Sequence, residues 1–312
     1  MKILVTGSNG LAGNGIRRAS KSSKSSNDDF IFMTRADADL TDWAETWQMI
    51  GDYKPDCVIN TSARVGGIGG NKAMHADFLY DNLMINANVL KACAKHNVSK
   101  AIAFSSVCVF PDDLSLLKEE NMHNGPVYDG NFAYGYAKRM VDVHITALKK
   151  QYGIDNYCSV IPSNIFGQND MFSIEYGHVV PSLIHKLFLA IQNKEPLVVW
   201  GDGRSLREFM YIDDLAELVL QLISLDKIPQ RVIISGRQQH SIREIVTMLS
   251  GIAQYDNIVW DETKPNGQRS RPTSKALVDS LFPDFEYTSI YNGLKKTWDW
   301  FCDNYPDVRK EY

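Results

Sequence analysis

The residues best suited to chemistry are a serine, a tyrosine and a lysine in the first half of the chain: Ser106, Tyr134 and Lys138. Tyr134 and Lys138 are four residues apart, so on a helix they share one face. Because an ammonium stabilises a phenolate, we expect Lys138 to lower the pKa of Tyr134 from about 10 toward neutrality. The Ser106 hydroxyl follows an apolar run and can hold a carbonyl oxygen beside that phenol. The three groups predict a proton-transfer device that supports hydride transfer to or from a carbon–oxygen bond.

A glycine-rich loop opens the chain between an expected strand at 2–6 and a helix expected from about Leu11. Gly7 permits a tight turn, Gly10 lets the backbone approach a pyrophosphate, and Gly13 lets the helix pack closely on the strand. The loop predicts a dinucleotide site that includes Gly7, Asn9, Gly10, Leu11 and Gly13.

The choice of dinucleotide depends on the residues after the second strand, expected at 30–34. Arg35 sits just past its end, where an arginine can pair with a 2′-phosphate and an acid would select NAD. Asp37 and Asp39 lie nearby, and as acids they favour NAD instead. We expect Asp39 and Leu40 to contact the adenosine end of the dinucleotide. On Arg35 we predict NADP(H) as the cofactor.

Strands and helices alternate along most of the chain. Strands are expected at 2–6, 30–34, 57–60, 101–105, 157–161 and 232–234, and long helices at about 76–96 and 134–152. This alternation predicts an α/β fold, a doubly wound parallel sheet (Rossmann) with right-handed crossovers. We expect residues 1–165 plus about 208–235 to form the NADP-binding domain. Residues of about 166–207 plus 236–312 break the alternation and predict a smaller, discontinuous substrate-binding lobe.

Composition favours a cytoplasmic enzyme. The 312 residues carry a formal charge of −4, with 33 basic and 37 acidic residues mixed along the chain, so we expect no nucleic-acid partner. No apolar run approaches the ~20 residues of a membrane span, and Met1 leads directly into a strand without a signal peptide. The five cysteines lack paired spacing, which predicts free thiols in a reducing compartment and no metal site.

The chain resembles the extended short-chain dehydrogenase/reductases and, more narrowly, the GDP-L-fucose synthase family, over nearly its whole length. The narrowest signals are the cysteine two residues after Ser106, a Val-Gly-Gly-Ile string and a His-Val-x-Pro string. The resemblance is carried by residues 64–68, 106–111, 134–138, 162–167, 177–181 and 199–203 running on to 207–209.

The resemblance implies conversion of GDP-4-keto-6-deoxy-mannose to GDP-L-fucose, with epimerisation at C3 and C5 and reduction at C4 by NADPH. The hydrogens on C3 and C5 of a 4-keto sugar are acidic, so inversion needs one group to remove a proton and another to return it. Cys108 and His178 take these roles, since a thiol and an imidazole can both act near neutral pH. Ser106 and Tyr134 would stabilise the enolate oxygen, and Tyr134 with Lys138 would support the reduction.

The resemblance also implies binding residues and a homodimer formed through the helices at 76–96 and 134–152. Cofactor contacts are expected from Ser62, Ala63, Tyr134, Lys138, Pro162, Asn164, Ile165 and His178. Substrate contacts are expected from Asn164, Lys186, Trp200, Arg207 and Arg271.

Three departures from the family pattern leave alternatives open. Lys186 stands where the family usually has arginine, Asn9 replaces a basic residue that can help bind the 2′-phosphate, and Val107 replaces a common second serine. A related 4-reductase or epimerase-reductase acting on a GDP-colitose or GDP-heptose precursor therefore remains an alternative. A 4,6-dehydratase is disfavoured because Val107 and Cys108 supply no carboxylate pair, and a nucleotide-binding module without activity because Tyr134 and Lys138 are both present.

Overall fold

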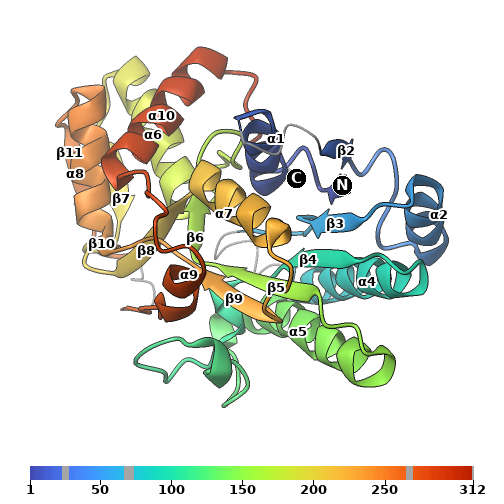
Figure 1. Ribbon diagram of the computed structural model, residues 1–312. Coiled ribbons are helices and arrows are strands. Elements are labelled where there is room, and N and C mark those ends of the chain that lie inside the picture. The colour runs from blue at the N-terminus through green and yellow to red at the C-terminus, as the bar shows by residue number, and fades with distance from the viewer. Residues whose placement is uncertain (23–27, 67–73, 265–269, 311–312) are drawn as a thin grey trace.

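The centre of the molecule is a six-stranded parallel sheet with strand order β2-β1-β3-β4-β5-β9 (Figure 1). The computed structural model describes residues 1–22, 28–66, 74–264 and 270–310. The sheet confirms the predicted doubly wound α/β fold. Its strands are β1 (Lys2–Thr6), β2 (Asp29–Met33), β3 (Cys57–Asn60), β4 (Lys100–Phe104), β5 (Tyr157–Pro162) and β9 (Arg231–Ile234).

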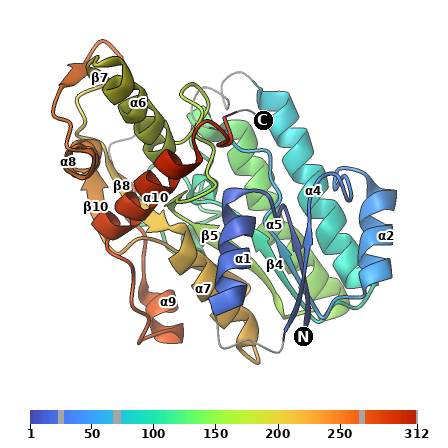
Figure 2. The same cartoon turned by 90° about the horizontal axis from the view of Figure 1, so that it is seen from above.

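The sheet is buried on both faces because its strand side chains alternate between two apolar clusters. Ile3 and Val5 of β1 enter one cluster, and Leu4 enters the other. The helices α1 (Leu11–Ser22) and α7 (Ile212–Ser224) pack together over the first face (Figure 2). The helices α2 (Trp43–Tyr53), α4 (His75–Lys95) and α5 (Phe132–Tyr152) cover the second.

The strand order changes direction beside β1, which lies between β2 and β3. The chain passes from β1 to β2 and then crosses back over β1 to reach β3. Connections that leave the carboxyl ends of neighbouring strands in opposite directions open a crevice, where doubly wound sheets bind ligands. The glycine loop and the residues that follow β3, β4 and β5 all lie at this edge.

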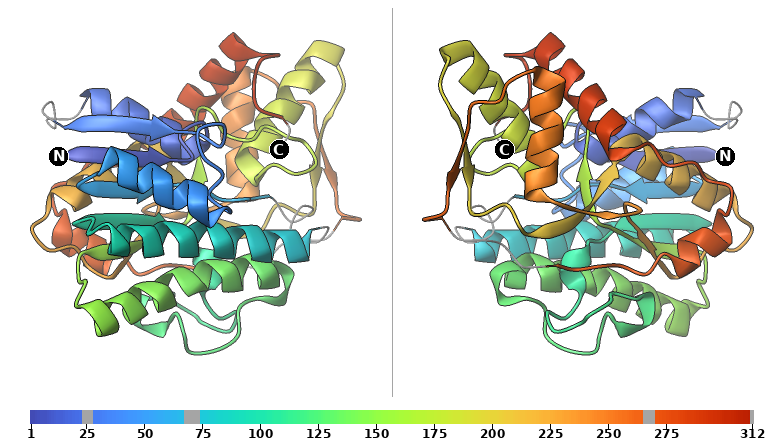
Figure 3. Two further views of the ribbon diagram at one scale, coloured as in Figure 1. Left: turned by 90° about the vertical axis from the view of Figure 1, so that its right-hand side faces the viewer. Right: turned by 90° about the vertical axis from the view of Figure 1, so that its left-hand side faces the viewer.

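The remaining elements form a smaller lobe at one end of the sheet (Figure 3). Its three-stranded sheet has the order β10-β8-β6, and β7 pairs with β11. The apolar cluster that contains Ile3 of β1 also contains Phe301 of α10, so the lobe and the large sheet share one core. The lobe contains β6 (Asn164–Phe166), α6 (Val179–Asn193), β7 (Leu197–Trp200), β8 (Leu206–Tyr211), β10 (Gln239–Ser241), α8 (Ile242–Ala253), β11 (Ile258–Asp261) and α10 (Ile290–Asn304), while α9 (Ala276–Leu281) packs on β9.

Helix ends follow local sequence signals. Asp42 caps α2 by accepting a hydrogen bond from the Glu45 backbone N–H, and Ser241 begins α8 with a capping box. Gly153 ends α5 in the left-handed conformation, at φ 71°. Within the part of the chain that the structure describes, no helix is long and apolar enough to cross a membrane.

Candidate active site

The loop after β1 forms a cradle that side chains would fill. A Cβ added at Gly7, which has φ +67°, would lie 2.8 Å from the Ser62 Cα. A Cβ at Gly13 would lie 2.4 Å from the Ser8 Cα, so α1 packs this closely on the loop only because Gly13 has no side chain. The first turn of α1, all of it described, carries no acidic residue. The exposed backbone at a helix N-terminus without a carboxylate fits a diphosphate, so the residues present suit a dinucleotide.

The segment after β3 lies against this cradle. The Ser62 N–H donates to the Asn60 side chain at 3.1 Å, and the Thr6 hydroxyl also donates to Asn60, at 2.8 Å. Ser62 and Ala63 therefore continue β3 toward the glycine loop. The Arg64 guanidinium that follows pairs with Asp81 at 2.7 Å. Gly67 and Ile68, which carried part of the family resemblance, lie outside the described residues.

Arg35 and its acidic neighbours form a hydrogen-bonded turn after β2. The Arg35 side chain is 86% exposed and pairs with Asp39 at 3.2 Å. Hydrogen bonds from Thr41, and then the Arg35 charge, hold the pKa of Asp39 below its usual range. The Asp37 carboxylate accepts from Thr34 at 2.7 Å. Arg35 is thus open to a ligand but shares its charge with one carboxylate, while Leu40 is buried in the core.

Ser106, Cys108 and Tyr134 are brought together after β4. Ser106 caps a short 3-10 turn at Val107–Val109, and its Oγ accepts from the Cys108 N–H at 3.2 Å. The Ser106 hydroxyl is also hydrogen-bonded to the Tyr134 phenol, in the first turn of α5. The Asn131 amide donates to the Cys108 Sγ at 3.3 Å. Nothing in the local sequence marks Asn131, because its contact depends on how α5 packs against the turn.

The electrostatics of Tyr134 and Lys138 differ from our prediction. The Lys138 Nζ lies 6.0 Å from the Tyr134 ring centroid and donates to the Phe104 carbonyl at 2.8 Å. Burial raises the pKa of Tyr134 and lowers the pKa of Lys138 to about 7. The prediction that Lys138 brings the Tyr134 pKa toward neutrality is wrong here, because desolvation penalises both charged forms and the ammonium is directed at a carbonyl.

Two arginines from distant segments act on the Cys108 thiol. Burial raises the pKa of Cys108, while the Ser106 hydrogen bond and the charges of Arg271 and Arg207 work in the opposite direction. Arg271 donates to the carbonyls of Phe110 and Pro111, at 3.1 and 2.9 Å. Two guanidinium groups near one thiol favour its thiolate and provide donors for a phosphate.

A buried network behind Arg207 holds the Arg271 segment in place. The Glu208 carboxylate, 3% exposed, accepts from the Thr273 hydroxyl at 2.6 Å and is ion-paired with Lys275. The network ties residues 271–275 to β8. Nothing in the local sequence marks this network, because Glu208, Thr273 and Lys275 have the composition of ordinary surface residues. Residues 265–269 of the late basic loop lie outside the described residues.

His178 and the other expected binding residues lie in the smaller lobe or next to it. His178 precedes α6, and although its surface is exposed, desolvation and the Arg309 charge lower its pKa. No described contact joins His178 to Cys108. Lys186 lies over the Trp200 ring at 4.5 Å, with Trp200 56% exposed. Asn164, between Pro162 at the end of β5 and Ile165 in β6, donates to the Glu208 carbonyl at 3.2 Å.

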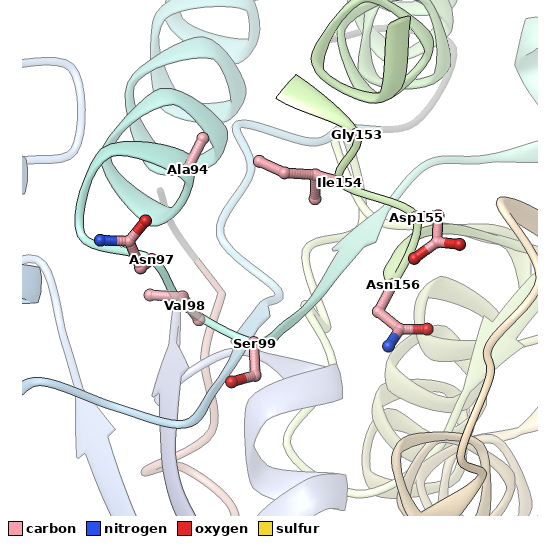
Figure 4. A pocket seen from close by; sticks show the side chains of 8 residues that line it. All are labelled: Ala94, Asn97, Val98, Ser99, Gly153, Ile154, Asp155 and Asn156. Atoms are coloured by element: carbon pink, nitrogen blue, oxygen red, sulfur yellow. The ribbon is translucent and has the colours of Figure 1, made fainter. Parts of the chain in front are cut away.

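An open hollow lies away from these groups (Figure 4). It has a volume of about 250 Å³ and is lined by residues 94, 97–99 and 153–156. These residues end α4 and α5 and precede β4 and β5, so the hollow lies at the amino edge of the sheet. The catalytic candidates follow the carboxyl ends of the strands, at the opposite edge. We therefore do not assign the reaction to this hollow.

The fold and the site together place this chain in a class of dinucleotide-dependent enzymes. The chain belongs to the NAD dependent epimerase/dehydratase family, whose sequence model matches residues 3–235.

Within that family it belongs to the GDP-L-fucose synthase group. A GDP-L-fucose synthase of Dictyostelium discoideum is 37% identical over 99% of this chain and 97% of the relative. A GDP-L-colitose synthase of Yersinia pseudotuberculosis is 30% identical over 97% of this chain and 98% of the relative's length. The crystal structure of a GDP-L-fucose synthetase from Naegleria fowleri bound to NADP has a TM-score of 0.93 at 34% identity, covering 99% of this chain and 95% of that one.

Proposed function

We propose that the chain is an NADPH-dependent epimerase-reductase that converts GDP-4-keto-6-deoxy-mannose to GDP-L-fucose. The observation that carries the proposal is the arrangement of Ser106, Cys108 and Tyr134 around one position, with Arg207 and Arg271 beside the thiol. A reductase without epimerase activity needs the serine and tyrosine but has no use for a thiol aided by two cations.

In this proposal the epimerisation step uses Cys108 and His178. Cys108 reacts through its thiolate form, which burial disfavours and the charges of Arg207 and Arg271 favour. The thiolate removes a proton from a carbon next to the ketone, and His178 returns a proton to the opposite face. Its lowered pKa keeps most of the His178 imidazole neutral near pH 7, so it donates only after taking up a proton. Ser106 and Tyr134 hydrogen-bond the enolate oxygen that forms between the two transfers.

The reduction step uses Tyr134 as the proton donor. The raised pKa of Tyr134 keeps the phenol protonated, which suits donation to the C4 oxygen. When bound, the nicotinamide would supply a hydride to C4. Lys138 would lie beside the cofactor ribose and hold the helix that carries Tyr134 against β4 through the Phe104 carbonyl.

We propose NADPH as the preferred dinucleotide, supported by the exposed Arg35 and by the relative from Naegleria fowleri bound to NADP. The cofactor would bind residues 1–165 and about 208–235. Its contacts would come from the glycine loop, from Asp39 and Leu40, from Ser62 and Ala63, and from Pro162 to Ile165.

The sugar nucleotide would bind residues of about 166–207 and 236–312. Arg207 and Arg271 would bind its diphosphate, and Trp200 with Lys186 would line the nucleotide pocket. Asn164 would contact the sugar or its phosphate from the boundary between the two parts.

A second candidate is the same chemistry on another GDP-4-keto sugar. The similarity to the GDP-L-colitose synthase of Yersinia pseudotuberculosis favours it, as does Lys186 where the fucose-type pattern usually has arginine. These enzymes share the keto chemistry, so the active-site residues distinguish them poorly.

The test is to incubate the protein with NADPH and GDP-4-keto-6-deoxy-mannose in deuterated water and identify the product by NMR. We expect GDP-L-fucose with deuterium at C3 and C5. A product that keeps the mannose configuration at both centres would refute the epimerase assignment.

Matched variants separate the two half-reactions. Cys108→Ser should slow deuterium exchange by roughly 10²–10⁴-fold while NADPH still binds. Tyr134→Phe should block NADPH oxidation while some exchange survives. Exchange at the normal rate in Cys108→Ser would leave a simple 4-keto sugar reductase as the better description.

We also propose a homodimer through α4 and α5. These helices pack against each other and leave large apolar side chains exposed, Tyr80 at 60%, Phe132 at 47% and Val143 at 41%. Two copies would bury them in a four-helix contact that braces the helix of Tyr134. Light scattering at micromolar protein concentration should give twice the mass of one chain. The Val143→Asp variant should have the mass of a single chain. A monomeric mass for the unaltered, fully active protein would refute the dimer.

A further inference from the structure

The chain returns to the glycine loop at its C-terminal end. After α10, the red segment in Figure 1 comes down beside α1. It is held there by a hydrogen bond from the Phe172 N–H to the Arg309 carbonyl, at 2.8 Å, and by the buried side chain of Val308. The backbone at Val308 and Arg309 is therefore anchored, which limits where the Arg309 guanidinium can reach.

The Arg309 guanidinium lies where the glycine loop is open. A Cβ added at Gly10 would lie 3.9 Å from the Arg309 Nη1. Burial and the charge of Arg309 lower the pKa of His178, so the guanidinium also acts on the residue that precedes α6. Arg309 is thus at the mouth of the dinucleotide cradle.

This position places two sources of positive potential side by side. The N-terminus of α1 carries the positive end of the helix dipole, and its first turn has no acidic residue. The charge of Arg309 also acts on the buried carboxyl group of Asp170, whose pKa is raised to about 7 by burial. A guanidinium beside a helix N-terminus is favourable when an anion lies between them.

We propose that Arg309 binds the diphosphate of the dinucleotide, supplied from the C-terminal segment to the glycine loop. The inference rests on the proposed use of NADPH. Asn9 carries no charge, so it cannot supply a cation to the glycine loop. In this proposal the cation is the Arg309 guanidinium, which comes from the C-terminal segment. The C-terminal segment and the loop then hold the diphosphate from two sides.

The test is direct binding, which requires no sugar substrate. Fluorescence titration of NADPH and of NADH is compared for the unaltered protein, Arg309→Ala and Arg309→Lys. Lys310→Ala is the matched control, because Lys310 is next in the chain and lies over the Tyr305 ring at 5.1 Å. Displacement by 2′-AMP, which has no diphosphate, reports on the adenosine end of the site.

We expect Arg309→Ala to lower the affinity for NADPH and the affinity for NADH by the same factor, on the order of ten-fold or more, because a charge-assisted contact is lost. Arg309→Lys should recover part of the affinity, and Lys310→Ala should change neither dinucleotide. Displacement by 2′-AMP should be unchanged in all three variants.

Three results would overturn the inference. If Arg309→Ala left the affinity for both dinucleotides unchanged, Arg309 would not be part of the site. If only the affinity for NADPH fell, Arg309 would contact the 2′-phosphate and not the diphosphate. An equal loss for 2′-AMP would indicate a general structural role. Failure of the proposed function is distinguishable, because it would appear as the wrong NMR product or as no dinucleotide binding by the unaltered protein.

Discussion

Lys138→Met tests whether the buried ammonium carries the energetic penalty that its surroundings imply. Lys138 is 1% exposed, and its pKa is about 7 against an ordinary value of 10.5. A difference of about 3.5 units, at about 1.4 kcal/mol each, sets an upper limit of about 5 kcal/mol for this penalty. Methionine has a similar length and no charge, so the substitution removes the penalty and also removes the hydrogen bond to Phe104, worth about 1–2 kcal/mol. The net expectation is a variant more stable by about 3 kcal/mol at pH 7.

The pH dependence gives the sign of the effect. The folded-state pKa of Lys138 is lower than the unfolded-state value, so the penalty is complete below pH 7 and disappears as the pH rises toward 10.5. The stability advantage of Lys138→Met should therefore fall by about 1 kcal/mol per pH unit between pH 7 and 9.

Urea unfolding of the dinucleotide-free protein at pH 6 to 9, at constant ionic strength, measures this difference. Lys150→Met, an exposed position on the same helix, should change stability by less than about 0.5 kcal/mol at every pH. The stabilised Lys138→Met should also lose NADPH oxidation, as expected where function needs a strained residue. A variant less stable than the parent at pH 7, or a difference that does not change with pH, would refute the reasoning.

Three further predictions follow from the charges around the site. Arg271→Ala removes a cation that favours the Cys108 thiolate, so the pH profile of deuterium exchange should move to higher pH by roughly 0.5–1 unit. Arg204→Ala, at an exposed arginine, should leave the profile unchanged. If the profile of Arg271→Ala did not move, Arg271 would have no effect on the charge state of the thiol. Arg35→Ala should weaken NADPH by roughly ten-fold and leave NADH nearly unchanged in binding titrations, and equal affinities for the two dinucleotides in the parent protein would contradict the cofactor preference. Glu208→Gln leaves Lys275, its partly buried partner, without a counter-charge and should destabilise the protein by about 2–4 kcal/mol in urea. A loss under about 0.5 kcal/mol would show that this pair is not needed to hold residues 271–275 against β8.

Much of the fold could be predicted from local pattern. The buried runs at 57–60 and 157–161 became β3 and β5, and the helix expected at 76–96 became α4 at His75–Lys95. Cys57, Cys93 and Cys158 are buried, as is usual for free cysteines, which pack as small apolar side chains. These features depend on residues that are neighbours in the chain, where periodicity and glycine spacing carry the information.

The arrangement of the site depended on contacts between residues far apart in the sequence. The spacing of Tyr134 and Lys138 correctly placed them on one helix, but the direction of the Lys138 ammonium was set by the packing of α5 against β4, and its pKa by burial. The approach of Arg271 to Cys108 and of Arg309 to Gly10 has no signature in the local sequence. The sequence alone determined which chemical groups are present and on which elements they lie. Only the tertiary structure decided their charge states and partners, because desolvation and Coulomb interactions depend on distance in space and not on distance along the chain.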